Sequence, residues 1–214
     1  SPLAAGDRLL AGGSGVEEAL SPPRHLLGGR DGLLLAIICV AWAGNFFTST
    51  VALREFPPLL FTALRLILLA VLLGTFLRRP APGQWPLLVA VALCNGVLHF
   101  GLGFWSMSLS STLASPAIVM QSYVPIAALL GWGLKGERPG PRAVAAIALS
   151  FLGVLVLGFD PAVLERPAAV VLMLISAFFL ALGSVLMREL KGMGVFSQQG
   201  WTAVIGIAPL LAWS

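Results

Sequence analysis

The chain has 214 residues, of which 58% are apolar and 10% are charged, and its mean hydropathy is +0.95. So few charges cannot cover the surface of a soluble domain of this length, so the composition argues for an integral membrane protein. The 13 Lys and Arg residues lie in short clusters between apolar runs and form no basic stripe, so a nucleic-acid partner is not expected.

The first 30 residues are predicted to form a disordered cytoplasmic tail. They are rich in Gly, Pro, Ser and Arg, and they lack the continuous apolar stretch of a signal peptide. A second interpretation is that this segment lies upstream of the true start of the protein.

Seven apolar runs follow, each long enough for a helix to cross about 30 Å of hydrocarbon at about 1.5 Å per residue. They lie at about residues 33–52, 57–77, 85–107, 112–134, 142–159, 168–187 and 196–214. Because the runs are long and show no alternation of period two, they favour helices over a β-barrel. The predicted fold class is an all-α, multi-spanning helical bundle.

The basic residues between the runs alternate in number from one side to the other. One side holds two of them, Arg54 and Arg166. The opposite side holds ten: Arg8, Arg24, Arg30, Arg78, Arg79, Lys135, Arg138, Arg142, Arg188 and Lys191. Because Lys and Arg concentrate in cytoplasmic loops, the N-terminus is predicted to be cytoplasmic, with external loops at about 53–56, 108–111 and 160–167. The expected location is the cytoplasmic (inner) membrane.

A few polar side chains lie inside the runs at similar depths. Measured from the predicted external ends at about 1.5 Å per residue, the amide, His and Arg side chains come out about 10 to 18 Å deep. Polar groups in hydrocarbon normally face the bundle interior or a water-filled path, so this layer predicts a central substrate site. The predicted substrate-binding residues are Trp42, Asn45, Arg65, Asn95, His99, Gln121 and Tyr123.

Each of these residues also has a structural interpretation, and both interpretations stay open. Asn45 and His99 can hydrogen-bond between helices, and Trp42 can pack or sit in an interfacial aromatic belt. Arg65, the only formally charged residue inside a run, can hold helix packing or bind an anionic group of a substrate.

Enzyme motifs are missing from the sequence. It contains no Gly-rich phosphate loop, no GxSxG, no HExxH and no paired carboxylates within a run. Cys39 and Cys94 both fall inside apolar runs without metal-ligand spacing. Neither catalysis nor a cofactor or metal is therefore expected.

Several motifs resemble the EamA-like branch of the drug/metabolite transporter superfamily. The family's W-x-x-N-F … P-P … R run has a counterpart in Ala41-Trp42-Ala43-Gly44-Asn45-Phe46, Phe56-Pro57-Pro58 and Arg65. Further matches are Leu113-Ala114-Ser115, Gln121, the ending Gly136-Glu137-Arg138 and Gly153-Val154-Leu155-Val156-Leu157. The order and spacing of these motifs carry the resemblance.

The resemblance implies ten helices in two inverted five-helix repeats of roughly 140 residues. The first repeat would occupy 31–160 and the second would begin at 168 and run to 214. On this interpretation the sequence is truncated within the second repeat, and the 214-residue chain is not expected to transport by itself.

The implied function is export of small polar metabolites, such as amino acids or their derivatives, by alternating access. The resemblance points towards the amino-acid-metabolite exporters of the cysteine/O-acetylserine type. The expected partners are the lipid bilayer and a small polar or zwitterionic metabolite, and a homodimer stays open. One alternative is a multidrug or cation exporter, although the small four-helix kind relies on a membrane-buried carboxylate that this chain lacks. The other is a non-transporting membrane scaffold.

Overall fold

The computed structural model describes residues 29–112, 114–136, 140–158 and 166–214. Three predicted features lie wholly or partly outside the described residues. They are residues 1–28 of the tail predicted at 1–30, most of the loop predicted at 160–167, and Glu137-Arg138 of the Gly-Glu-Arg ending.

The described residues form helices and no strands, at the positions of all seven apolar runs. The first two runs are α3 (Gly29–Ala52) and α4 (Pro58–Leu73), which the short 3₁₀ turn η2 (Gly74–Phe76) extends. The third run is α5 (Trp85–Ala92), η3 (Leu93–His99) and α6 (Phe100–Leu109), and the fourth is α7 (Ala114–Met120) and α8 (Tyr123–Lys135). The last three are α9 (Pro141–Gly158), α11 (Pro167–Met187) and α12 (Val195–Trp213). The predicted all-α class is confirmed.

Five of the seven runs, α3, α4, α5–α6, α7–α8 and α11, are long and apolar enough to cross a membrane. Among the described residues, α9 is a shorter apolar helix and α12 does not reach this threshold. The chain is thus a multi-spanning helical membrane protein, and membrane crossing by α9 and α12 stays a prediction.

The chain divides into two units, residues 1–45 and 46–214, and the boundary falls inside α3. The described part of the first unit is a single helical stretch whose apolar side chains are largely exposed, as Val40 is at 71%. A helix that is apolar and exposed all round is typical of a segment that lies in lipid.

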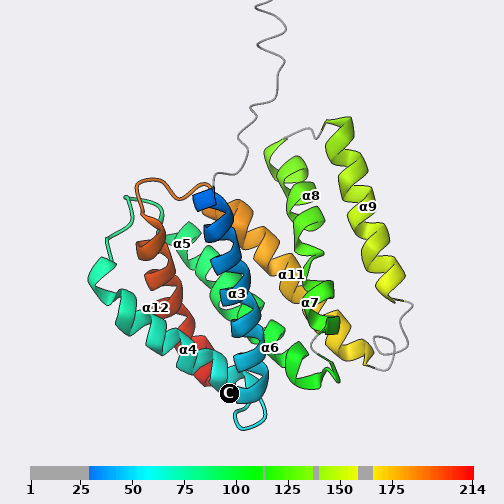
Figure 1. The fold of residues 1–214 in the computed structure, drawn as a ribbon. Coiled ribbons are helices and arrows are strands. Elements are labelled where there is room, and N and C mark those ends of the chain that lie inside the picture. Colours follow the sequence, from blue (N-terminus) through cyan, green and yellow to red (C-terminus); the bar gives the residue numbers. More distant parts are fainter. Residues whose placement is uncertain (1–28, 113, 137–139, 159–165) are drawn as a thin grey trace, which may run out of the picture. The chain divides into compact units, whose positions relative to one another are not determined.

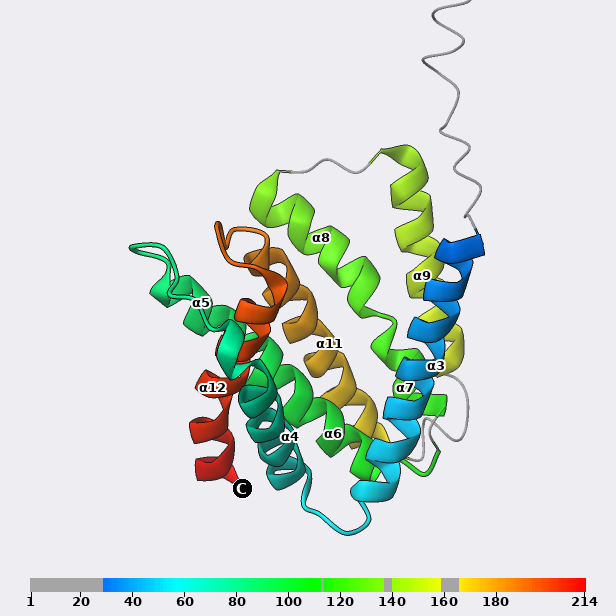
Figure 2. The same cartoon turned by 60° about the vertical axis from the view of Figure 1, so that its left-hand side comes forward.

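In the larger unit, the two C-terminal helices pack among the earlier ones. Helix α11 lies between α6 and α8 (Figures 1 and 2), and α12 lies along α4. Glycines allow this close approach: a Cβ on Gly206 of α12 would lie 2.6 Å from Leu66 Cδ1, and one on Gly96 would lie 3.0 Å from Thr202 Cγ2. Small residues at such contacts are the usual device for packing helices in membranes, where apolar burial does not drive association.

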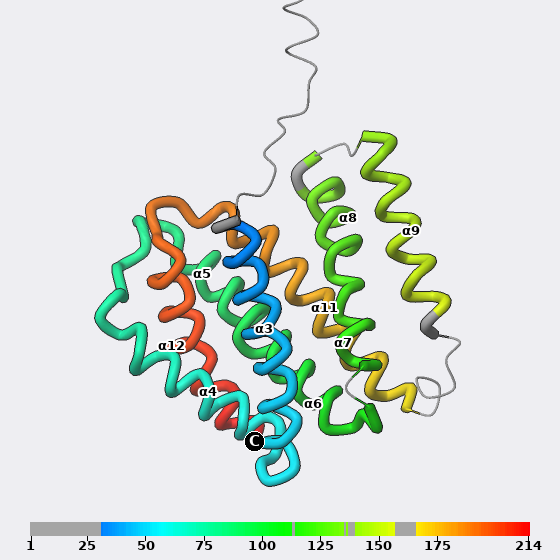
Figure 3. The backbone as a smooth tube through the Cα atoms, in the orientation of Figure 1, coloured from blue at the N-terminus to red at the C-terminus, as the bar shows by residue number. Residues whose placement is uncertain are grey.

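The third run contains a π-helix. Helix α5 continues through the seven-residue π segment η3 directly into α6, as the backbone trace in Figure 3 shows. A π segment shifts the direction of the side chains that follow it, and such segments often occur at functional sites. Two predicted site residues, Asn95 and His99, lie within η3.

The fourth run is broken between α7 and α8. Because Pro125 has no N–H, the carbonyl oxygen of Gln121 cannot accept the usual bond from the residue four positions later. It accepts instead from the N–H of Val124 at 3.2 Å. The structure thus places Gln121 and Ser122 in a turn.

Candidate functional site

Arg65 lies against an aromatic surface inside the larger unit. Its guanidinium carbon is 4.9 Å from the ring centre of Phe100 and 5.4 Å from that of Phe104. The two rings stack at 5.9 Å with an interplanar angle of 19°, and Phe61 meets Phe104 edge-on at 5.0 Å. We call Phe61, Phe100 and Phe104 the aromatic shelf. A cation over aromatic faces gains about 0.5 to 2 kcal/mol, so the shelf helps hold a charge in an apolar interior.

His99 is fixed by a serine of another helix. His99 Nδ1 lies 2.9 Å from Ser176 Oγ and 3.3 Å from the Ser176 carbonyl oxygen. The Ser176 hydroxyl donates in turn to the carbonyl oxygen of His99 at 2.8 Å. Since that hydroxyl has one proton and already donates it, Nδ1 of His99 carries the proton of the ring–hydroxyl bond. In the neutral ring Nε2 is then the acceptor.

Asn95 lies one turn before His99 and faces α11. Its side chain is 8% exposed, and Oδ1 is buried with no hydrogen-bond partner among the described residues. A Cβ placed on Gly183 of α11 would lie 2.6 Å from Asn95 Cγ and closer still to Oδ1. Only glycine at position 183 therefore lets the amide sit where it does. A buried amide carbonyl without a partner is costly in an apolar interior and is a natural place for a ligand donor.

Arg65, Asn95 and His99 gather around one segment of the third run. The His99 ring lies 4.7 Å from that of Phe100, the ring over which Arg65 is placed. The π segment η3 thus carries an imidazole acceptor and an amide carbonyl that face α11. Phe100, which follows it directly, contacts the Arg65 guanidinium of α4. Such a set can recognise a ligand that carries both a negative group and hydrogen-bond donors.

Two other predicted residues are not joined to this group. Gln121 is exposed in the turn between α7 and α8, and Tyr123 is half-buried at the start of α8. Within the part of the chain that the structure describes, no hydrogen bond or ring contact links either residue to Arg65, Asn95 or His99. Their binding role stays a prediction.

Trp42 and Asn45 lie in the first unit. Trp42 is 54% exposed, and Asn45 is half-buried on the same helix. Because the two units are described separately, the placement of these residues against Arg65 and His99 also stays a prediction.

Several residues of the candidate site were missed by the sequence reasoning. Ser176, Gly183 and the shelf residues Phe100 and Phe104 were not singled out. The available signal was weak: Ser176 is a hydroxyl in an apolar run, and phenylalanine is common in every membrane helix. A serine in the middle of an apolar span was nevertheless a candidate for an interhelical hydrogen bond.

No group of three or more His, Cys, Asp or Glu side chains that could hold a metal occurs among the described residues.

Comparison with known proteins places the chain in a family. Residues 31–159 match the model of the EamA-like transporter family. Two proteins called "Probable amino-acid metabolite efflux pump", from Escherichia coli and Salmonella typhimurium, are each 30% identical to this chain, over 186 and 189 residues. The matches cover 84% and 85% of this chain and 62% of each relative.

An uncharacterized transporter of Bacillus subtilis is 32% identical over 168 residues, which are 75% of this chain and 54% of that relative. No solved structure matches the chain. The chain thus spans less than two thirds of the length of the curated relatives it matches. The family match covers more than half of the chain and confirms the resemblance seen in the motifs. This chain belongs to the EamA-like transporter family.

Proposed function

We propose that the chain is part of a secondary transporter that exports small polar metabolites, amino acids or their derivatives, across the cytoplasmic membrane by alternating access. Its N-terminus lies in the cytoplasm and it performs no catalysis. The names of the Escherichia coli and Salmonella relatives support a metabolite of this class.

The observation that carries the proposal is the position of Arg65 on the aromatic shelf. A guanidinium carries a planar fork of N–H donors, and this geometry recognises a carboxylate. The described helices from α4 to α12 contain no Asp or Glu. A substrate carboxylate has the charge and the planar geometry to pair with the Arg65 guanidinium.

The neighbouring groups match the rest of an amino acid. The ammonium group of a zwitterion can donate to the Asn95 carbonyl oxygen and to Nε2 of a neutral His99. A lipophilic cation, by contrast, meets the positive charge of Arg65 and no carboxylate within the described helices α4 to α12. The site thus favours a zwitterion or a carboxylate over a cationic drug.

Alternating access is supported by the way the two segments meet. In the proposed scheme, residues 31–160 form one five-helix repeat and 168–214 begin its inverted counterpart, with the substrate between them. The His99–Ser176 bonds and the Asn95–Gly183 contact join these two segments at the site. Rocking of one repeat against the other would break or remake these contacts.

A transport assay tests this function. Because the relatives are longer than the chain, the chain is extended with the C-terminal part of the Escherichia coli relative and placed in liposomes. Export of labelled amino acids above protein-free vesicles is the expected result. Movement of lipophilic cations alone would indicate a multidrug exporter, and movement of neither class, with folded protein present, would indicate a scaffold.

A further inference from the structure

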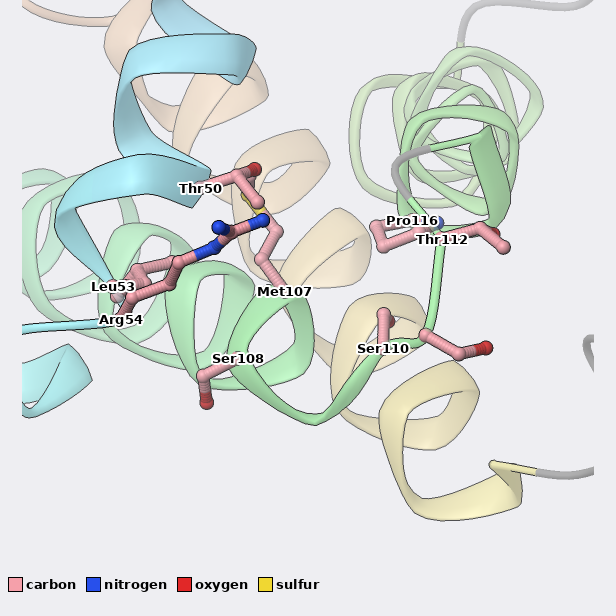
Figure 4. Close-up of a pocket in the computed structure, with 9 residues that line it drawn as sticks. Thr50, Leu53, Arg54, Met107, Ser108, Ser110, Thr112 and Pro116 are labelled. Carbon is pink, nitrogen blue, oxygen red and sulfur yellow. The ribbon is translucent and has the colours of Figure 1, made fainter.

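A second polar site lies at the predicted external end of the larger unit. It is a pocket of about 370 Å³ built from the end of α3, the end of α6 and the segment that leads into α7 (Figure 4). Its one basic side chain is that of Arg54, which projects between Thr50 and Met107 in this view. Five hydroxyl groups complete the polar lining, those of Thr50, Ser108, Ser110, Ser111 and Thr112.

Three of these hydroxyls already donate their protons to the backbone. Each one bonds the carbonyl oxygen three or four residues before it, at 3.0 Å for Thr50, 2.8 Å for Ser108 and 2.9 Å for Ser110. A hydroxyl has one proton and two lone pairs, so these three oxygens can offer only acceptor lone pairs to a ligand. The N–H donors of the pocket come chiefly from the guanidinium of Arg54.

This division of donors and acceptors selects a ligand with two opposite charges. A carboxylate pairs with the guanidinium fork, and an ammonium donates to the hydroxyl oxygens. A plain anion leaves the acceptor oxygens unused, and a plain cation is repelled by Arg54. The apolar part of the wall, formed by Leu53, Met107 and Pro116, can contact the short aliphatic body of such a molecule.

We propose that this pocket binds a small zwitterion, with its carboxylate at Arg54 and its ammonium at the hydroxyl oxygens of Thr50 and Ser110. It is an outer site, separate from Arg65. Arg65 lies about two turns after the start of α4, and no residue of α4 lines the pocket. That the zwitterion is the exported metabolite on its way out rests on the function proposed above. The binding itself does not.

Cysteine protection in the 214-residue chain tests the proposal. A single Cys at Ser111 is introduced after replacing Cys39 and Cys94 by Ser, and the chain is placed in phosphatidylglycerol nanodiscs. L-Alanine should slow labelling of this Cys by a maleimide, whereas N-acetyl-L-alanine and L-alanine methyl ester, each with one of the two charges, should protect far less. Arg54→Gln should raise the half-protecting alanine concentration about tenfold or more, because a charge-assisted bidentate pair is lost.

Two control variants separate this site from other effects. Arg166→Gln removes the same charge at an exposed position outside the pocket and should leave protection unchanged. Arg65→Gln should also leave it unchanged, so failure of the central site and failure of this pocket give different results.

Three outcomes would overturn the proposal. The first is no protection by alanine, and the second is equal protection by N-acetyl-L-alanine, which would mark a plain anion site. The third is protection by phosphatidylethanolamine in the discs without any alanine, which would assign the pocket to a lipid headgroup.

Discussion

His99 and Ser176 are joined by a reciprocal pair of hydrogen bonds: the ring Nδ1 lies 2.9 Å from the hydroxyl, and the hydroxyl donates to the His99 carbonyl oxygen at 2.8 Å. Both residues are buried, at 3% and 0% exposure. The pair fixes the imidazole of a π-helix against α11 and orients the ring. It is therefore both a packing contact and a determinant of the site.

Removing the Ser176 hydroxyl should destabilise the fold. Ser176→Ala removes the bond between His99 Nδ1 and the Ser176 hydroxyl, and also the bond from that hydroxyl to the His99 carbonyl oxygen. The ring keeps only its 3.3 Å contact with the carbonyl oxygen of residue 176. We therefore expect the free energy of unfolding to fall by about 1 to 2 kcal/mol. Ser184→Ala is the matched control on the same helix, because its hydroxyl bonds only the carbonyl oxygen of Leu180 in its own helix. Thermal unfolding in detergent measures both variants. Equal losses of unfolding free energy in the two variants would mean that the His99–Ser176 bonds stabilise the fold no more than a bond within one helix does.

Gly183→Ala should force Asn95 out of its position. The added methyl group meets the Asn95 amide, and overpacking of this kind costs about 1 to 3 kcal/mol. Because Asn95→Ala removes the colliding amide, the double variant should recover most of the stability lost in Gly183→Ala. A double-mutant cycle of melting measurements gives the coupling. Additive losses of stability in the two single variants would show that the side chain of Asn95 does not collide with a methyl group at position 183.

The aromatic shelf should set ligand affinity through Arg65. Phe100→Leu keeps an apolar side chain but removes the ring 4.9 Å from the guanidinium, so binding of a labelled carboxylate ligand should weaken about two- to fivefold. Phe178→Leu, at a 40% exposed ring of α11, serves as the control and should have no effect. In an Arg65→Gln background Phe100→Leu should cause no further loss. A further loss there would assign Phe100 a role independent of Arg65.

Orientation can be read by cysteine accessibility in intact cells. Single cysteines at Glu55 and Ser110 should react with an impermeant thiol reagent, and those at Arg79 and Gly140 should be protected, because basic loops remain in the cytoplasm. Cys39 and Cys94 are replaced first. The reversed labelling pattern would place the N-terminus outside the cell.

The helical spans could be predicted from the sequence because hydrocarbon leaves a backbone no other way to satisfy its hydrogen bonds than in helices or closed barrels. Arg65 and His99 could be found because a polar group in an apolar run is rare. Their surroundings could not be found in this way. Ser176 reaches His99 from 77 residues away, and a lone serine gives no signal of its partner.

The π segment η3 was also beyond sequence reasoning. No residue of Leu93–His99 marks a π segment rather than an α-helix, and η3 packs against α11 and α12, which lie far from it in the sequence. The close approach of Gly183 to Asn95 likewise joins two helical segments that are far apart in the sequence. Such features depend on which faces meet, and that information is spread over distant parts of the chain.

Arg65 carries the central claim, that the interior site binds a substrate carboxylate. If it does, Arg65→Gln should abolish binding and transport while the protein stays in the membrane at near-normal amounts. Arg65→Lys should also bind the substrate poorly, because lysine lacks the planar two-pronged donor. If Arg65 serves only packing, both variants should lower abundance and melting temperature while transport per molecule survives.

The most direct measurement is amino-acid export per folded molecule by the Arg65→Gln variant of the extended chain in liposomes, with folded protein quantified by size-exclusion chromatography. If Arg65 binds the substrate carboxylate, the normally folded variant should export no more than protein-free vesicles do. Export at the unsubstituted rate would contradict this role of Arg65.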